Sequence, residues 1–146
     1  MQMWASASSA GARILAAALV ILLCACSDTT APDLLLSFHK ERFDEQGPSP
    51  TTTAEGGADR ITVRGSLATP CLASPSEVIA EAERSGSDLE LRVGWVPAGD
   101  CVPGVNTFVY EAVLGELGRG LYQLRVLHVL TGYAAYVTLE EDVQVG

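Results

Sequence analysis

Basic residues are scarce in this sequence of 146 residues. Nine Lys and Arg stand against 18 Asp and Glu, which gives a formal net charge of −9 at pH 7. Proteins that bind nucleic acid neutralise its phosphates with Lys and Arg, and anionic lipid headgroups attract basic segments. The composition therefore argues against nucleic acid as a partner and against electrostatic binding to anionic headgroups.

Recognisable motifs of catalysis and metal binding are also missing. The sequence has no Gly-x-Ser-x-Gly elbow, no His-Glu-x-x-His pair and no phosphate-binding glycine loop. His39 and His128 lack the short spacing to cysteines that zinc would need. The carboxylates at residues 140–142 could supply oxygen ligands for calcium. A calcium site there is the less favoured interpretation, because no Asp-x-Asp-x-Asp loop is present. We expect no enzyme activity, no metal and no cofactor, with His39 solvated and His128 facing inward on a strand.

The apolar run at residues 14–25 is too short to span a bilayer. It holds 12 residues, whereas a membrane-spanning helix needs roughly 20. A run of this length near the N-terminus, preceded by Arg13, is typical of the hydrophobic region of a secretory signal peptide. The sequence therefore predicts an exported protein.

The end of this run resembles the lipobox of bacterial lipoproteins. Leu23, Cys24, Ala25 and Cys26 supply a Leu, a tolerant position, a small residue and then Cys. The resemblance implies that residues 1–25 are a lipoprotein signal peptide, and that Cys26 carries lipid, palmitate included. It also implies a location in the cell envelope, and Ser27 favours the outer membrane over the inner. Residues 26–33 would be a flexible tether.

Cysteine is limited to four residues, and two of them belong to this segment. Cys24 would leave with the signal peptide and Cys26 would be lipidated, so Cys71 and Cys101 remain as a pair. An even pair in an exported chain indicates a disulfide. A metal site is the alternative, but zinc would require further ligands at short spacing.

The rest of the chain alternates between apolar and polar residues over short stretches, as half-buried strands do. Turn residues separate these stretches, which is typical of a β-sandwich. Residues 44–59 have no apolar pattern and are expected to be a long loop, and Thr131-Gly132 is expected to be a two-residue hairpin loop. We predict a single antiparallel, all-β sandwich domain over residues 34–146. Its seven strands are expected at 34–43, 60–69, 75–85, 88–96, 106–114, 121–130 and 133–141.

Residues 75–85 are compatible with either a helix or a strand. Ser74, Pro75 and Glu77 match a helix start. A hairpin with residues 88–96 instead pairs Ala82 with Leu91, Ala80 with Val93 and Val78 with Trp95, and it sets Glu81 against Arg92. A shift by one residue would bury Glu81 and Glu83. We therefore favour the strand, which also brings Cys71 near Cys101.

Residues 114–126 resemble the corner between strands E and F of immunoglobulin-like and fibronectin type III-like sandwiches. In these families a Leu, a Gly-containing turn and a Tyr-x-Leu-x-Val strand recur, and the Tyr hydroxyl bonds to the backbone upstream. The resemblance implies that Leu117 is the buried leucine and that Tyr122 is the corner tyrosine. It implies an immunoglobulin-like fold for the domain.

These features predict a lipid-anchored envelope protein that acts as a non-catalytic binding or assembly module of unknown ligand. The expected partners are the membrane, through the lipid anchor, and an envelope protein or glycan. An envelope enzyme inhibitor or a glycan-binding module, acting through loops at the end of the sandwich, is the alternative. The candidate loops are residues 74–76 and 97–104, both of which the disulfide would hold.

Overall fold

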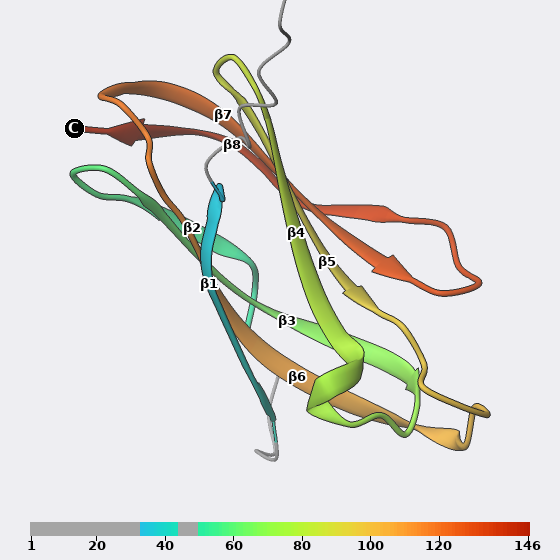
Figure 1. Ribbon diagram of the computed structural model, residues 1–146. Helices are drawn as coiled ribbons and strands as arrows, with labels where there is room; N and C mark the ends of the chain where they lie inside the picture. Colours follow the sequence, from blue (N-terminus) through green and yellow to red (C-terminus); the bar gives the residue numbers. More distant parts are fainter. Residues whose placement is uncertain (1–32, 44–49) are drawn as a thin grey trace, which may run out of the picture. The chain divides into compact units, whose positions relative to one another are not determined.

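The computed structural model describes residues 33–43 and 50–146, which form two four-stranded β-sheets packed together as a sandwich (Figure 1). The strand order is β1-β6-β3-β2 in the first sheet and β4-β5-β7-β8 in the second. The predicted signal peptide at 1–25 and Cys26 lie outside the described residues. The strands are β1 (Leu35–Arg42), β2 (Thr53–Gly56), β3 (Ile61–Cys71), β4 (Val78–Ser85), β5 (Asp88–Trp95), β6 (Pro103–Leu114), β7 (Gly120–Leu130) and β8 (Tyr136–Val145).

The all-β prediction is confirmed for this part of the chain. Its one helical element is a 3₁₀ turn, η1 (Pro75–Glu77), directly before β4. Across residues 33–43 and 50–146, no helix has the length and the apolar character that a membrane crossing requires.

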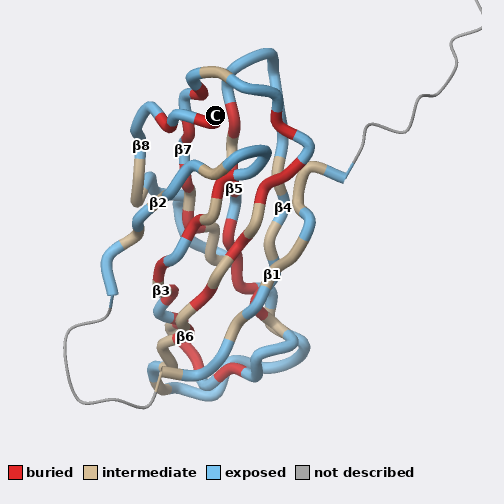
Figure 2. Tube along the Cα trace, turned by 90° about the vertical axis from the view of Figure 1, so that its left-hand side faces the viewer, coloured by how far each residue is buried: buried red, intermediate tan, exposed pale blue. Residues whose placement is uncertain are grey.

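The core lies between the sheets and is built by alternation along the long strands (Figure 2). In β3 the inward residues Ile61, Val63 and Leu67 are fully buried, while Arg64 and Ala68 are exposed. Phe108 from β6 and Val126 from β7 meet them in the same cluster. Each fully buried aliphatic or aromatic side chain contributes roughly 1.5–3 kcal/mol to stability, so this inner layer holds the sandwich together.

The hairpin of β4 and β5 has the predicted register. Val78 pairs with Trp95, Ala80 with Val93 and Ala82 with Leu91, while Glu81 lies opposite Arg92. The helix signals of residues 74–77 produce η1 alone, because the alternation that follows buries Val78 and continues as a strand. Strand formation at 78–85 is therefore confirmed.

Two expectations about the sheets are wrong. β2 lies inside the expected loop at 44–59, so the sandwich has eight strands rather than seven. β2 is a four-residue edge strand of Thr, Ala, Glu and Gly, which is too short and too polar to show alternation. The expected turn at Thr131-Gly132 is present, since the N–H of Tyr133 donates to the carbonyl of Leu130, but the loop continues to residue 135 and is longer than two residues.

The sandwich is also not antiparallel throughout, because β5 and β7 run parallel. The β4–β5 hairpin places β5 inside the sheet and β4 at its edge. Burial explains this choice, since Leu89, Leu91 and Val93 of β5 are buried on one face, whereas β4 carries exposed Glu81 and Glu83. Charged residues are typical of edge strands. The immunoglobulin-like strand arrangement is therefore not shown.

The chain enters the sandwich at one end and forms its disulfide at the other. The N–H of Gly115 donates to the carbonyl of Leu34, and Leu114 pairs with both Leu35 and Ile61. From this entry end β3 runs 11 residues to Cys71, about 33 Å at ~3.3 Å per residue. We call the opposite end, formed by residues 71–79, 95–108 and 127–139, the distal end.

Candidate functional site

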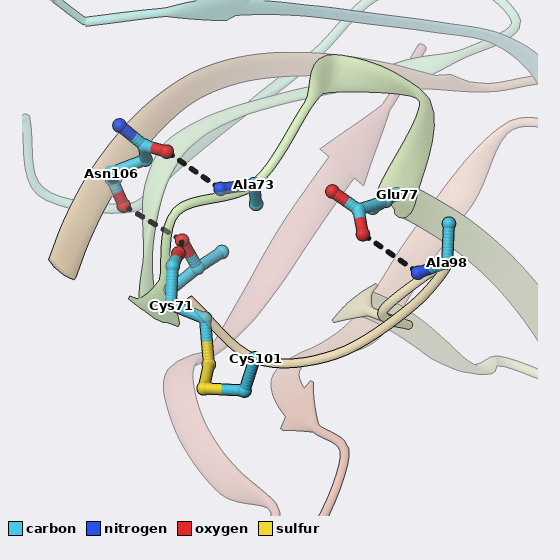
Figure 3. Close-up of a disulfide and its surroundings, with 7 residues drawn as sticks. Cys71, Ala73, Glu77, Ala98, Cys101 and Asn106 are labelled. Atoms are coloured by element: carbon cyan, nitrogen blue, oxygen red, sulfur yellow. Dashed lines mark hydrogen bonds between the residues drawn. A yellow bond between two sulfur atoms is a disulfide. The ribbon is translucent and has the colours of Figure 1, made fainter. Parts of the chain in front are cut away.

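A disulfide joins Cys71 and Cys101 at the distal end, as predicted (Figure 3). Cys71 is the last residue of β3, and Cys101 lies in the loop between β5 and β6. Their Cα atoms are 5.4 Å apart, within the usual range for a disulfide. The loop at 96–102 leaves the second sheet at the end of β5, and the disulfide ties it to β3 of the first sheet. The loop is therefore held by both sheets of the sandwich.

The carboxylate of Glu77 holds the two distal loops together. Its Oε1 accepts from the N–H of Ala98 at 2.7 Å (Figure 3). Its Oε2 accepts from the N–H of Ser74 at 2.6 Å. These two hydrogen bonds lower the pKa of Glu77 below its ordinary value. The carbonyl of Glu77 also accepts from the N–H of Val96 at 2.9 Å. One residue therefore fixes the loops at 72–77 and 96–102 against each other.

Asn106 at the start of β6 adds a further restraint. Its Oδ1 accepts from the N–H of Ala73 at 2.7 Å, directly after the disulfide. The N–H of Leu72 donates to the carbonyl of Val102 at 2.9 Å, which continues the pairing of β3 with the β6 segment beyond the end of β3. The backbone of the distal loops is therefore bonded at several points.

The side chains that these loops present to solvent are aliphatic. Leu72, Val96 and Val102 are about half exposed, and Val105 on β6 is 71% exposed. Because the backbone is fixed, these side chains are held outward in a defined arrangement. This is a preorganised apolar surface, and preorganisation lowers the entropy that a binding event must overcome.

The connection between β7 and β8 adds further exposed side chains at the distal end. Every residue from 131 to 137 is exposed, including Tyr133, Tyr136 and Val137. The base of this connection is fixed, because the N–H and Oγ1 of Thr131 both donate to the carbonyl of Trp95, at 3.2 and 3.0 Å. We call residues 131–137 the hairpin tip.

His128 connects the hairpin tip to the core. It faces inward on β7 with 2% exposure, as the alternation predicts. Its Nε2 shares a hydrogen bond with Tyr110 Oη at 2.9 Å, and its Nδ1 shares one with Tyr136 Oη at 3.3 Å. Burial lowers the pKa of His128 to about 4 and raises the pKa of Tyr110. The imidazole is therefore neutral at pH 7 and bridges the two sheets.

The residues of the predicted tyrosine corner lie at the entry end. Tyr122 Oη donates to the carbonyl of Gly118 at 2.9 Å, and both Leu117 and Tyr122 are buried. Trp95 at the end of β5 is also buried, and its Nε1 has no acceptor among the described residues. Leu117 and Tyr122 support the fold at the entry end, away from the exposed distal surface, whereas Trp95 is buried at the distal end.

Ionic side chains form a separate region on the outer face of the second sheet. Arg92 pairs with Glu90 at 2.6 Å and with Glu83 at 3.5 Å, while Arg125 pairs with Glu90 at 3.8 Å and with Glu140 at 3.9 Å. We call these five residues the charge ladder. Solvent-exposed pairs of this kind contribute little to stability.

The candidate metal ligands do not assemble in the described part of the chain. No group of three or more His, Cys, Asp or Glu there is placed to hold an ion, residues 140–142 and Asp100 included. His39 lines a shallow surface groove beside Glu41 and Glu111. Arg64 in the same groove pairs with Glu111 at 2.7 Å.

Sequence reasoning missed most of the contacts that build the distal surface. The helix-start pattern of Ser74 and Glu77 signals their own hydrogen bond, but nothing in the sequence indicates that Glu77 also binds Ala98. The uncharged stretch at 127–139 was the available signal for the hairpin tip.

The fold and its geometry thus define the class of the protein as a two-sheet, all-β sandwich with an internal disulfide. No family model, no curated protein and no solved structure matches the chain.

Proposed function

We propose that the chain is a lipid-anchored protein of the cell envelope, with a slight preference for the outer membrane, and that it works as a non-catalytic binding module. The lipobox-like residues that end in Cys26 support the anchor. An internal disulfide is expected of a chain that folds in an oxidising compartment and supports export. Two or more acyl chains give a stable anchor, whereas one chain gives marginal binding.

The observation that carries the binding role is the rigid apolar surface of the distal end. The disulfide, Glu77 and Asn106 fix its backbone, and Leu72, Val96 and Val102 point into solvent. The entry end lies about 33 Å away along the 11 residues of β3. A chain anchored through its N-terminus can therefore present this surface away from the membrane that holds it.

The two distal loops at 72–77 and 96–102 favour a protein over a glycan as ligand, whereas the exposed Tyr133 and Tyr136 of the hairpin tip suit either. Sugar-binding surfaces commonly stack aromatic rings on the ligand, whereas the loops at 72–77 and 96–102 contain no aromatic residue. Exposed aliphatic side chains with a fixed backbone suit the apolar centre of a protein interface. An enzyme inhibitor would be one form of such a partner-binding module.

An immunoglobulin-like origin of the sandwich is part of this proposal. The hydrogen bond from Tyr122 to Gly118 supports it. The parallel contact of β5 with β7 counts against it, because the sheets of that family are antiparallel.

Two measurements on the full chain in its host test the proposal. Mass spectrometry of the native protein is expected to find an acylated Cys26 as the first residue, and C26A is expected to stay unlipidated. A photo-crosslinking residue at Val102 is expected to give a defined adduct in intact cells. An unmodified Cys26 in native material would remove the anchor from the proposal. A lipidated, folded chain that gives no adduct from Val102 would remove the binding role of these loops.

A further inference from the structure

We propose that the hairpin tip is an acid-released lid, which a buried cluster of polar side chains holds closed against the first sheet at pH 7. The cluster draws on both sheets, and we call it the polar latch: Thr52, Tyr110, His128, Tyr136 and Thr138. Such a lid goes beyond the proposed function and is independent of the lipid anchor and of the binding role.

The polar latch connects the two sheets on the side of the sandwich where β2 and β8 lie. Tyr110 of β6 is paired with Gly65 of β3, and a Cβ atom at residue 65 would come within 2.5 Å of Tyr110 Oη and 3.0 Å of Thr52 Oγ1. Glycine at this position therefore leaves room for the tyrosine hydroxyl. That hydroxyl meets His128 Nε2 of the second sheet at 2.9 Å and is also hydrogen-bonded to Thr52 and Thr138.

Tyr136 connects the polar latch to the hairpin tip. Its Oη shares a hydrogen bond with His128 Nδ1 at 3.3 Å, and the two rings meet edge to face with their centroids 5.4 Å apart. Tyr136 is 47% exposed, whereas His128 is 2% exposed. The tyrosine therefore lies between the buried imidazole and the solvent.

Few other buried contacts hold the hairpin tip. All of residues 131–137 are exposed, and β8, which the structure describes in full, has no buried residue before Val143. A bulge at Thr138 interrupts the pairing of β8 with β7, and a strand can bend at a bulge. The segment after β2 supports β8 near the entry end, where the N–H of Gly146 donates to the carbonyl of Gly57 at 3.0 Å. The tip can therefore open locally while the sandwich stays folded.

Acid acts on the polar latch through His128. A neutral imidazole has one donor and one acceptor nitrogen, which suits two hydroxyl partners. The imidazolium that forms in acid would be a buried charge, and burial lowers the pKa of His128 to about 4. Protonation of a buried histidine is a general means of opening a structure as the pH falls.

The strands packed against His128 supply no carboxylate that would stabilise an imidazolium. The titratable groups in contact with it are the hydroxyls of Tyr110 and Tyr136. Within the described part of β3, β5 and β6, the inner faces carry no charged side chain. On β8, Glu141 is on the inner side but is paired with Leu124, about 13 Å along β7 at ~3.3 Å per residue.

The cations on the inner sides of β1 and β4 are directed elsewhere. Lys40 of β1 donates to the carbonyl of Val78 on β4, on the opposite side of the sandwich. Arg84 of β4 lies over the ring of Tyr122 at the entry end. Since no neighbour offsets the charge, the imidazolium must reach water, and the half-exposed Tyr136 is the group it displaces. Displacement of Tyr136 releases the hairpin tip.

Hydrogen exchange of the full chain at a series of pH values tests the lid. Each exchange rate is divided by the intrinsic rate at that pH, so that the protection factor reports the opening equilibrium. We expect protection in peptides covering residues 131–139 to fall at least tenfold between pH 7 and pH 5. This opening is expected to depend only weakly on urea, because it exposes little buried surface. Peptides covering residues 120–126 are expected to keep the higher protection that global unfolding sets.

Two results of this measurement would overturn the lid. Equal protection and equal urea dependence at residues 131–139 and 120–126 would mean that both segments open together in global unfolding. Unchanged protection at residues 131–139 between pH 7 and pH 5 would mean that acid does not act on the tip.

Variants of the two histidines identify the trigger. H128Q removes the titrating group, so protection at residues 131–139 is expected to be independent of pH between 7 and 5. H39Q is the matched control, because His39 is exposed on β1 and lies outside the polar latch. It is expected to keep the wild-type fall in protection. The same pH dependence in H128Q and H39Q would overturn the role of His128.

Tyr136→Phe tests the latch without altering the core. The substitution keeps the half-exposed ring and removes only the hydroxyl that bonds to His128. We expect Y136F to fold normally and to lower protection at residues 131–139 at least threefold at pH 7. Protection equal to that of the wild type would contradict a lid held by this hydrogen bond.

Discussion

His128 is a neutral bridge between the sheets because it is buried. Its ring nitrogens are hydrogen-bonded to the hydroxyls of Tyr110 and Tyr136, and burial lowers its pKa to about 4. An unfolded histidine titrates near pH 6.5. Between these two values the unfolded chain binds more protons than the folded one, so stability falls as the pH falls through that window.

We therefore predict that His128 makes the fold acid-sensitive between pH 6.5 and pH 4. Its contribution is complete above pH 6.5 and is lost as the pH drops to 4, a change of up to about 3 kcal/mol in the free energy of unfolding. Urea unfolding at a series of pH values measures it. His128→Gln removes the titrating group and is expected to flatten the curve in this window. An unchanged slope in H128Q would assign the acid sensitivity to other groups.

Glu77 is the second residue whose ionisation affects the structure, here through the hydrogen bonds of the distal loops. Its carboxylate accepts two backbone N–H groups, and these hydrogen bonds lower its pKa. Glu77→Gln replaces one acceptor oxygen by an amide nitrogen, so one of the two N–H groups loses its partner. We predict faster amide hydrogen exchange at Ala98 or Ser74 in E77Q than in the wild type. The protection of these amides in the wild type is expected to fall toward that in E77Q as the pH falls through the lowered pKa of Glu77.

Glu81→Gln is the matched control, since Glu81 lies on the adjoining strand opposite Arg92. E81Q is expected to leave exchange at Ala98 and Ser74 unchanged. Equal exchange in E77Q and the wild type would mean that the carboxylate of Glu77 does not hold these loops.

At the level of the elements, the position of β5 inside its sheet determines how much its side chains contribute to the free energy of unfolding. Leu91 is fully buried on β5, while Leu121 on the adjacent β7 is 57% exposed on the outer face. We predict that Leu91→Ala lowers the free energy of unfolding by about 3 kcal/mol, and that Leu121→Ala changes it by less than about 0.5 kcal/mol. Chemical denaturation at pH 7 compares them. Similar values for both would contradict the placement of β5.

The same strands show how much of the fold the sequence can predict. The β4–β5 register follows from local alternation, because a shift by one residue would bury Glu81 and Glu83. The parallel contact of β5 with β7 depends on strands that are distant in sequence, and the alternation of β7 fits either direction. The charges of β4 were the available sign that it is the edge strand.

The candidate site was predictable only where a contact is local. The pairing of Cys71 with Cys101 follows from the hairpin that separates them, and the Ser74–Glu77 contact follows from a helix-start pattern. The contact of Glu77 with Ala98 and that of Asn106 with Ala73 join segments 21 and 33 residues apart. No local pattern encodes such pairings, because the sheets bring these segments together.

At the scale of the whole molecule, the disulfide links stability to the shape of the distal end. Cys71 belongs to the first sheet, whereas the loop that carries Cys101 leaves the second sheet at Trp95. The cross-link closes a separation of 30 residues. In the chain-entropy model such a closure stabilises the fold by about 3–4 kcal/mol. Cys71 is itself part of the buried core, whose other members, such as Leu91 and Val126, pack between the sheets without a covalent link.

We predict that the double variant C71A/C101A keeps the sandwich but loses its preorganised distal surface. Its free energy of unfolding is expected to fall by about 3–4 kcal/mol, while far-ultraviolet circular dichroism stays that of a β protein. Amide exchange is expected to accelerate at residues 96–102 and to stay unchanged at the entry end near Tyr122. The adduct formed from a photo-crosslinking residue at Val102 is expected to fall with it, because the aliphatic side chains are no longer held in one arrangement. A variant with the same loss of stability but undiminished crosslinking would show that Glu77 and Asn106 hold the loops without the disulfide.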